Sequence, residues 1–374
     1  MTGKQKIQAA FTKEGTREIP AVICYEGIYI RDHWSQLTSC PWWYAEETEL
    51  DKQIQWRGEV FPKIGQDWYA LPSCPTKEER ANIMIQERTE GIFRVDRRNK
   101  NEERLHAPKI GGDSYQAWDN PQSPATPEDI DQLFPYSPLN PEDIEKNGRK
   151  DLAARLNTGL CAALCPLRHV VSPLQSCASI WGFSGFMIML KDDPGLVKYA
   201  CERLTAIQER KILEAKALGT EVIWIEECYV DMISPDMYKE FNTPYITRVT
   251  ESIRSAGMKS VYYHCGDPAH KLDQILDVGA DAVSFEESKK GFIIDIEDIV
   301  DAVQGRCTVL GNLDATGFLP VCTYDELKSS ISRFIAAGRK NKNRFIVSMG
   351  SPVTPETPVE KVRLYCELVH ELGS

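Results

Sequence analysis

The sequence predicts an α/β fold, a (β/α)8 TIM-type barrel with an inserted lid or hairpin region near residues 56–150. Three observations support this fold: five consecutive β-then-α units near the C-terminus, further candidate strands before them, and the lack of nucleotide-binding motifs. Alternating strands and helices are typical of a parallel sheet covered by helices. We expect residues 1–374 to form a single barrel domain with this insertion.

The five units each begin with a short apolar segment that favours a strand. These segments are residues 221–227, 259–265, 280–287, 307–314 and 344–351. Each is followed by apolar residues at helical spacing, in residues 236–257, 269–279, 295–304, 323–339 and 358–373. Thr323 and Glu326 have the spacing of a capping box, which predicts that a helix begins there.

Two more strands are expected earlier in the chain, at residues 19–27 and 157–167, with helices around 174–190 and 193–218. The total of about seven or eight strands favours a closed barrel over an open sheet. No G-x-G-x-x-G segment follows a strand, and no P-loop is present. These absences exclude the main nucleotide-binding open-sheet folds.

Residues 56–150 have a different pattern. They begin with segments typical of a strand and a hairpin, with a turn at residues 98–100, and continue with a stretch rich in Pro, Asn and Asp. Long irregular segments inside compact domains are often functional. We therefore expect this insertion to form a lid or cap over the barrel mouth.

The charge and the apolar content of the sequence limit which partners and which cellular compartment we expect. The net charge is −11, from 44 basic and 55 acidic residues, which argues against nucleic-acid binding because phosphate contacts need clustered Lys and Arg. The sequence has no run of 18 apolar residues and no apolar leader segment, so we expect no membrane association and a cytoplasmic location. In that compartment the 12 cysteines are expected to be reduced and mostly buried.

Polar side chains gather where the predicted strands end, which is the face that carries the chemistry in (β/α)8 barrels. The candidate catalytic residues are Glu227, His264 and Asp314. The candidate substrate-binding residues are Tyr25, Glu26, Tyr29, Tyr263, Asn312 and Ser351.

The segment "YYHCGD" (262–267) places a histidine and a cysteine side by side at a strand end. Imidazole and thiolate are both good zinc ligands, so His264 and Cys265 are candidate ligands, with Glu286 as a third. However, neighbouring residues of a strand point in opposite directions. The alternative is a buried thiol beside a histidine that acts as an acid or contacts the substrate. The residues alone leave both interpretations open.

Several segments carry a family resemblance, in the order "ISPDMYKEFNTPYITRVTESIRSAG" (233–257), "YYHCGD", "GNLDATGFL" and "FIVSMGSPVTPETPVEKV". With these segments the chain resembles the uroporphyrinogen decarboxylase superfamily, which also contains cobalamin-dependent methyltransferases. True decarboxylases of the family have an arginine-rich N-terminal motif that holds the substrate carboxylates. The matching region here reads "YEGIYIRDHW" (25–34), so the resemblance does not imply tetrapyrrole decarboxylation.

Zinc-dependent methyltransferases of this superfamily bind the metal through an "HxCG" motif and a later Cys. Here Cys265 keeps its position, while Tyr263 stands at the His position and Ser351 at the later Cys position. The resemblance therefore implies the other methyltransferase branch. In this branch a methyl group passes from a methoxylated, for instance aromatic, or other small-molecule donor to cobalamin.

The cobalamin is expected on a separate corrinoid protein, because this chain has no D-x-H-x-x-G motif. Two alternatives remain: a decarboxylase or lyase acting on a small carboxylic acid, and a non-catalytic ligand-binding barrel.

Overall fold

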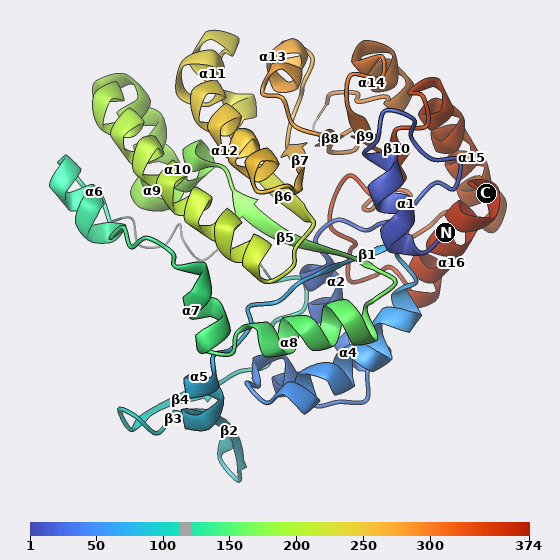
Figure 1. Cartoon of the computed structure of the whole chain (residues 1–374). Coiled ribbons are helices and arrows are strands. Elements are labelled where there is room, and N and C mark those ends of the chain that lie inside the picture. The colour runs from blue at the N-terminus through green and yellow to red at the C-terminus, as the bar shows by residue number, and fades with distance from the viewer. Residues whose placement is uncertain (113–121, 290) are drawn as a thin grey trace.

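The computed structural model describes residues 1–112, 122–289 and 291–374. Within these residues, seven parallel strands form one curled sheet in the order β1-β5-β6-β7-β8-β9-β10, and helices pack around it (Figure 1). A separate antiparallel sheet contains β2, β3 and β4. The strands are β1 (Trp68–Ala70), β2 (Ile83–Arg88), β3 (Gly91–Asp96), β4 (Asn101–Leu105), β5 (Cys165–Val171), β6 (Val222–Glu227), β7 (Lys259–His264), β8 (Ala282–Phe285), β9 (Thr308–Leu310) and β10 (Phe345–Ile346).

The α-helices of the first half of the chain are α1 (Gly3–Ala10), α2 (Glu26–Asp32), α3 (Trp34–Leu37), α4 (Leu50–Ile64), α5 (Lys77–Asn82), α6 (Pro127–Leu133), α7 (Pro141–Lys146) and α8 (Lys150–Arg155). Those of the second half are α9 (Pro173–Asp192), α10 (Pro194–Ala217), α11 (Pro235–Phe241), α12 (Thr243–Ser255), α13 (Leu272–Asp277), α14 (Ile296–Val303), α15 (Tyr324–Lys340) and α16 (Val359–Leu372). Three short helical segments are η1 (Trp42–Glu46), η2 (Leu156–Leu160) and η3 (Val230–Met232).

The five predicted β-then-α units are confirmed as β6 to β10 with the helices that follow them. Thr323 and Glu326 form the predicted capping box at the start of α15. The helix expected over 236–257 is instead two helices, α11 and α12, which meet at Asn242 just before Pro244. Proline lacks an N–H and fits only the first turn of a helix, so a new helix begins there.

The N-terminal part of the sheet differs from the expectation. The strand expected over 157–167 lies at 165–171, and residues 156–160 form η2. Residues 68–70, expected in the inserted region, form the edge strand β1 and pair with β5 of the main sheet.

The segment at residues 20–22 links the two edges of the curled sheet. Ala21 forms a parallel bridge with Val347, which follows β10, and the Val22 N–H donates to the Val347 carbonyl at 3.0 Å. On the other side, the Asp67 N–H donates to the Ala21 carbonyl at 2.9 Å, just before β1. The expected first strand, 19–27, is therefore present as a short bridging segment, and helix α2 begins at Glu26.

The three-stranded sheet lies apart from the curled sheet in Figure 1. Its turn at Lys100, with φ of 57°, is at the predicted hairpin position. Residues 113–121, which belong to the expected lid, lie outside the described residues. The chain termini lie close to one another beside α1 and α16 (Figure 1).

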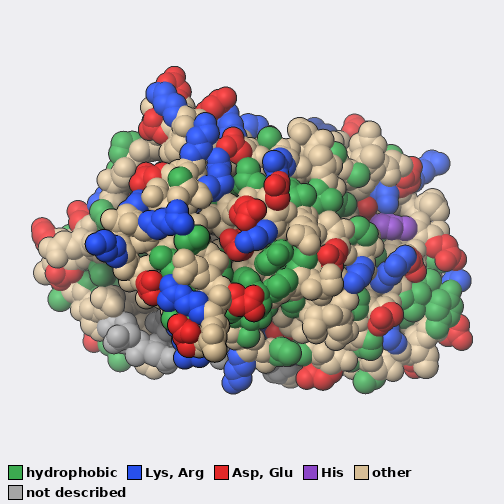
Figure 2. Space-filling model, turned by 90° about the horizontal axis from the view of Figure 1, so that it is seen from below, with side chains coloured by type: hydrophobic (Ala, Val, Ile, Leu, Met, Phe, Trp, Pro, Cys, Tyr) green, Lys and Arg blue, Asp and Glu red, His purple; other side chains and the backbone are tan. Residues whose placement is uncertain are grey.

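The surface carries mixed charge on the side shown in Figure 2, where Lys and Arg side chains alternate with Asp and Glu. Among the described residues, no helix combines the length and apolar character needed to cross a membrane.

Candidate functional site

A cavity of about 360 Å³ lies at the carboxyl ends of the central strands. Its walls come from the segments that follow β6, β7, β8 and β10, together with the start of α2. The lining residues are Tyr25, Ile28, Glu226, Cys228, Tyr229, Asp231, Met232, Tyr263, Cys265, Gly266, Glu286, Lys289, Ser351 and Pro352. Because substrate sites of parallel α/β folds lie beyond the carboxyl ends of the strands, this cavity is the candidate active site.

Strand register determines which side chains face the cavity. Glu226 pairs with Tyr263, and Glu227 pairs with His264. Side chains alternate along a strand, so paired residues of parallel neighbours point to the same face. Glu226 and Tyr263 line the cavity, whereas Glu227 and His264 lie on the opposite face of the sheet, fully buried.

The aromatic rings of Tyr25 and Tyr263 line the cavity, and Trp224 packs behind them. The rings of Tyr25 and Tyr263 lie 5.7 Å apart at 79°, and Trp224 lies 5.0 Å from Tyr263. The Tyr263 hydroxyl donates to the Gly350 carbonyl at 2.7 Å, which orients the ring. Tyr25 has a left-handed backbone, with φ of 54°, an unfavourable conformation for a bulky residue that is often found at functional sites.

A charged cluster closes another side of the cavity. The Lys289 ammonium group lies 2.7 Å from a Glu286 oxygen and donates to the Ser351 hydroxyl at 2.7 Å. Glu286 also accepts from the Gly266 N–H at 2.9 Å. These contacts join the loops after β7, β8 and β10, so the cluster holds three walls of the cavity in place.

Glu226 is held at the end of β6 by Gln175 of α9. The Gln175 side-chain amide donates to Glu226 at 3.1 Å, and its oxygen accepts from the Cys228 N–H at 2.5 Å. The carboxyl group is therefore oriented at the cavity wall by a side chain that is itself fixed at both ends.

Two thiols face the cavity, and their sulfur atoms are 2.8 Å apart, on Cys228 after β6 and Cys265 after β7. The hydrogen bond with Cys228 and burial raise the pKa of the Cys265 thiol well above its usual range, and Glu286 and Glu226 add to the effect. Cys265 is thus protonated at neutral pH.

The side chains that could bind zinc at this site do not converge on one point. His264 lies on the far face of the sheet from Cys265. Among the described residues, no group of three or more His, Cys, Asp or Glu side chains is placed to hold a metal ion. A structural zinc site needs four ligands and a catalytic one needs three. The described residues do not fit zinc, and none of the roles assigned below to side chains of this chain depends on a zinc ion.

Behind the sheet, Glu227 belongs to a buried polar network. The Tyr262 hydroxyl donates to Glu227 at 3.3 Å and lies 2.9 Å from both the Tyr238 hydroxyl and the Asn242 amide nitrogen. Burial raises the pKa of Glu227 to about 8. For His264, burial lowers the pKa to about 3. These pKa shifts favour the neutral form of both side chains at pH 7, and neither side chain lines the cavity.

The remaining predicted residues divide into two groups. Tyr25, Tyr263, Glu286, Ser351 and Cys265 meet in the cavity. Four others support the structure around it. Glu26 is buried and accepts a hydrogen bond from the Gln66 amide at 2.5 Å, and Tyr29 is buried beside His33. The Asn312 amide donates to the Glu286 and Ile294 carbonyls, both at 3.0 Å. Asp314 accepts from the Thr316 and Gly317 N–H groups at 2.9 and 2.7 Å.

Sequence reasoning did not select Glu226, Cys228, Tyr229 and Lys289, all of which line the cavity. A signal for the first two was present. If Cys265 faces the site, alternation places Tyr263 on the same face, and the equivalent positions of the preceding strand are Glu226 and Cys228.

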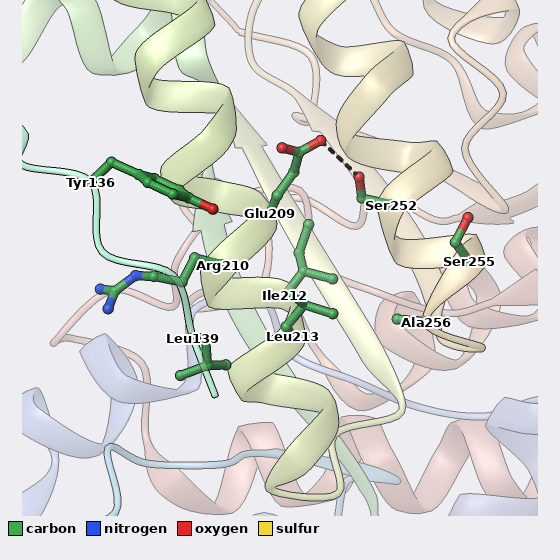
Figure 3. A pocket seen from close by; sticks show the side chains of 9 residues that line it. All are labelled: Tyr136, Leu139, Glu209, Arg210, Ile212, Leu213, Ser252, Ser255 and Ala256. Atoms are coloured by element: carbon green, nitrogen blue, oxygen red, sulfur yellow. Dashed lines mark hydrogen bonds between the residues drawn. The ribbon is translucent and has the colours of Figure 1, made fainter. Parts of the chain in front are cut away.

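Another cavity, of about 380 Å³, lies on the outer side of the fold (Figure 3). It lies between α10 and α12 and is bordered by Tyr136 and Leu139. Its carboxylate, Glu209, already accepts from Ser252 at 3.2 Å and pairs with Arg248 at 2.7 Å. None of its described lining residues belongs to a strand, so among them the convergent polar groups of the strand-end cavity are missing.

Buried carboxyl groups predict a fall in stability as pH rises from 6.5 to 8. Burial raises the pKa of Glu26 and of Glu227 from 4.5 to about 8, so the folded state keeps protons that the unfolded state has lost. Stability then decreases with pH, by up to about 1.4 kcal/mol per pH unit for each group, and levels off above the folded pKa. Urea unfolding at pH 6.5, 7.25 and 8 measures this slope. Glu227→Gln should roughly halve it, and an unchanged slope would contradict the assignment.

Much of the chain is similar in sequence to known proteins. Residues 119–372 match the family model described as uroporphyrinogen decarboxylase (URO-D). The chain is 30% identical over 193 residues to a uroporphyrinogen decarboxylase of Anaeromyxobacter sp., covering 50% of this chain and 52% of that protein. It is 24% identical over 173 residues to the uroporphyrinogen decarboxylase of Thermus thermophilus, covering 46% of this chain and 48% of that protein. The chain thus spans about half the length of the curated relatives it matches.

Among solved structures, the fold is similar to a methyltransferase from Methanosarcina mazei, with a TM-score of 0.69 and 17% identity over 100% of both chains. A likeness at this identity is evidence for a common fold.

Proposed function

The chain belongs to the uroporphyrinogen decarboxylase family, and from this premise we propose that it is a methyltransferase of the cobalamin-dependent branch. It would transfer a methyl group from a small donor in the strand-end cavity to a corrinoid carried by a partner protein. The observation that carries the proposal is the charge of the cavity. Among its described lining residues the cation is Lys289, which is paired with Glu286, while Glu226 and Asp231 add two further carboxyl groups.

This charge pattern argues against the decarboxylation of a polycarboxylic substrate, because several carboxylates need several cations to hold them. It also disfavours the alternative of a lyase for a small acid. A neutral ether or a methylated amine suits the cavity better, since Tyr25 and Tyr263 provide ring faces and the carboxylates repel anions.

For a methoxylated donor, we assign the role of general acid to Glu226. When the methyl–oxygen bond breaks, the electron pair stays on the oxygen, and alkoxide and phenolate are poor leaving groups unless they gain a proton. Glu226 lies at the cavity wall, held by Gln175, and in its protonated form can supply that proton. This role replaces the one that the sequence suggested for Glu227 and His264. The corrinoid, when bound on its partner protein, would supply the nucleophile that accepts the methyl group.

The partner would dock over the strand ends. Three exposed apolar side chains stand in the segments after β6, β8 and β9: Met232, Ile293 and Val321, which are 59%, 83% and 78% exposed. Apolar side chains at such exposure are typical of surfaces that meet another protein. We also propose that residues 20–22 take the place of the eighth strand of a (β/α)8 barrel. The proposed location of the protein is the cytoplasm, where cysteines stay reduced.

Methyl transfer to free cob(I)alamin tests the proposal. The purified chain is incubated with one donor at a time: a methoxylated aromatic acid, a neutral methoxylated phenol, a methylated amine and a quaternary ammonium compound. We expect the absorbance change of corrinoid methylation with the ether or the amine donors. If no donor class gives transfer while a small carboxylic acid releases CO2, the lyase alternative replaces the proposal. Binding without any turnover would favour a ligand-binding barrel.

A further inference from the structure

Cys228 and Cys265 differ from the other cysteines of the chain. All twelve are unpaired; ten are buried, and these two are half-buried. Both line the strand-end cavity, and their sulfur atoms are 2.8 Å apart. No assignment made above uses them, since they do not complete a metal site and Cys265 is protonated.

The strand register places the two cysteines where a disulfide could join them. Glu227 pairs with His264, and the next ladder bond runs from the Cys265 N–H to the Glu227 carbonyl at 2.9 Å. Cys228 and Cys265 are therefore opposite one another on neighbouring strand ends. Neighbouring strands lie about 4.7–4.9 Å apart, which is inside the Cα separation of about 4.4–6.8 Å that disulfides require.

The loops that carry the thiols are fastened to each other. The Asp267 N–H donates to Asp231 at 3.1 Å, and the Lys271 ammonium group donates to the Asp231 carbonyl at 3.3 Å. Gly266 has a φ of 97°, and a Cβ there would lie 2.4 Å from the Cβ of Asp231. This close packing, which needs glycine at position 266, holds the loop after β7 against the loop after β6.

We propose that Cys228 and Cys265 form a redox-active dithiol, which a hydroperoxide oxidises to a disulfide within the cavity. One sulfur attacks the peroxide oxygen, the O–O bond breaks, and a sulfenic acid and water (or an alcohol) form. The second sulfur then displaces water from the sulfenic acid, and the S–S bond forms. The two thiols lose two protons and two electrons, and the peroxide is reduced. A thiol reductant reverses the change. This site does not depend on methyl transfer.

The chain contains a matched control pair. Cys177 of α9 and Cys201 of α10 have sulfur atoms 3.6 Å apart, and both residues are 0% exposed. This pair has the proximity but no access from a cavity. If oxidation requires both a short distance between the sulfur atoms and access of the peroxide from a cavity, only Cys228 and Cys265 of these two pairs should be oxidised.

The experiment treats the folded full-length chain with hydrogen peroxide under anaerobic handling, alkylates the remaining thiols, and maps disulfides by peptide mass spectrometry. We expect the number of free thiols to fall by two from twelve, with a crosslink between the peptides of Cys228 and Cys265 that dithiothreitol removes. Cys265→Ser should abolish this crosslink, and Cys201→Ser should leave it unchanged.

Two results would overturn the proposal: both cavity thiols remaining free after the treatment, or the main crosslink joining Cys177 to Cys201. If Cys265→Ser does not fold, the wild-type peptide map alone decides between these outcomes. Where methyl transfer is also measured, the disulfide form should lose activity and regain it with the reductant. A crosslink without any methyl transfer would leave the dithiol in place and count only against the proposed function.

Discussion

Glu226→Gln is expected to lower the rate of methyl transfer from a methoxylated donor by about 10²-fold, which is typical for the loss of a general acid. The amide keeps the size of the carboxyl group and its position beside Gln175 but cannot give up a proton to the leaving oxygen. The rate of formation of the methylated corrinoid at saturating donor measures this effect. With a quaternary ammonium donor, whose leaving amine needs no proton, the same variant should lose much less.

The matched control is Glu227→Gln. Glu227 lies on the opposite face of β6 and does not line the cavity. Burial raises its pKa to about 8, so it is largely protonated at pH 7, and the amide imitates that form closely. We expect turnover close to that of the wild type. Equal losses of turnover in both variants would contradict the assignment of Glu226 to the cavity face of β6 and of Glu227 to its outer face. A loss of turnover in Glu227→Gln alone would mean that Glu227, and not Glu226, faces the cavity.

Trp224→Ala is expected to destabilise the fold by about 3–5 kcal/mol, as large-to-small changes of buried aromatic residues do. Trp224 is 0% exposed, and its ring lies 5.0 Å from Tyr263 and 5.8 Å from Trp68. It therefore supports the aromatic rings that line the cavity. Urea unfolding followed by far-UV circular dichroism measures the free energy of unfolding.

Trp224→Phe serves as its control. Among the described residues the indole N–H of Trp224 has no hydrogen-bond partner, so a phenyl ring loses packing area but no hydrogen bond. We expect a much smaller loss of stability than for alanine. Similar losses in the two variants would show that the indole N–H has a partner, for instance an ordered water molecule.

The C-terminal part of the fold could be predicted from the sequence because its signals are local and strong. β6 to β8 are β-branched or aromatic segments that end at turn residues, and the following helices have apolar residues at regular spacing. The capping box at Thr323 and Glu326 located the start of α15 closely. Near the N-terminus, β1 has three residues and residues 20–22 form only a bridge. The sequence indicated a strand near both places, but segments this short carry too little periodicity to set their ends or to show that residues 68–70 join the main sheet.

The place of the site could also be predicted, because the carboxyl ends of parallel strands converge on one face. The choice between neighbouring residues was harder. Glu226 and Glu227 are chemically identical, and the pairing of Glu226 with Tyr263 in the folded sheet is what places one carboxyl in the cavity and the other behind it. His264 was predicted to be catalytic because it is titratable and stands at a strand end, but it lies on the same outer face of the sheet as Glu227.

Contacts between loops could not be predicted from the sequence. Lys289 and Ser351 are 62 positions apart and meet at 2.7 Å, and Gly266 meets Glu286 across two strand ends. No local pattern encodes such distances, because they depend on how far each loop folds back over the sheet. The aromatic residues of the N-terminal segment show the same limit: Tyr25 reaches the cavity, whereas Tyr29 is buried in the core.

The central claim is that the methyl donor binds in the strand-end cavity, and a crystal structure of the chain with a donor that it turns over tests this most directly. Crystals grown without corrinoid should hold the donor intact. We predict electron density for the donor in the strand-end cavity, against the rings of Tyr25 and Tyr263, with its methyl-bearing atom beside Glu226. Density instead in the outer cavity between α10 and α12, beside Tyr136 and Leu213 (Figure 3), would contradict the account and move the active site to that face.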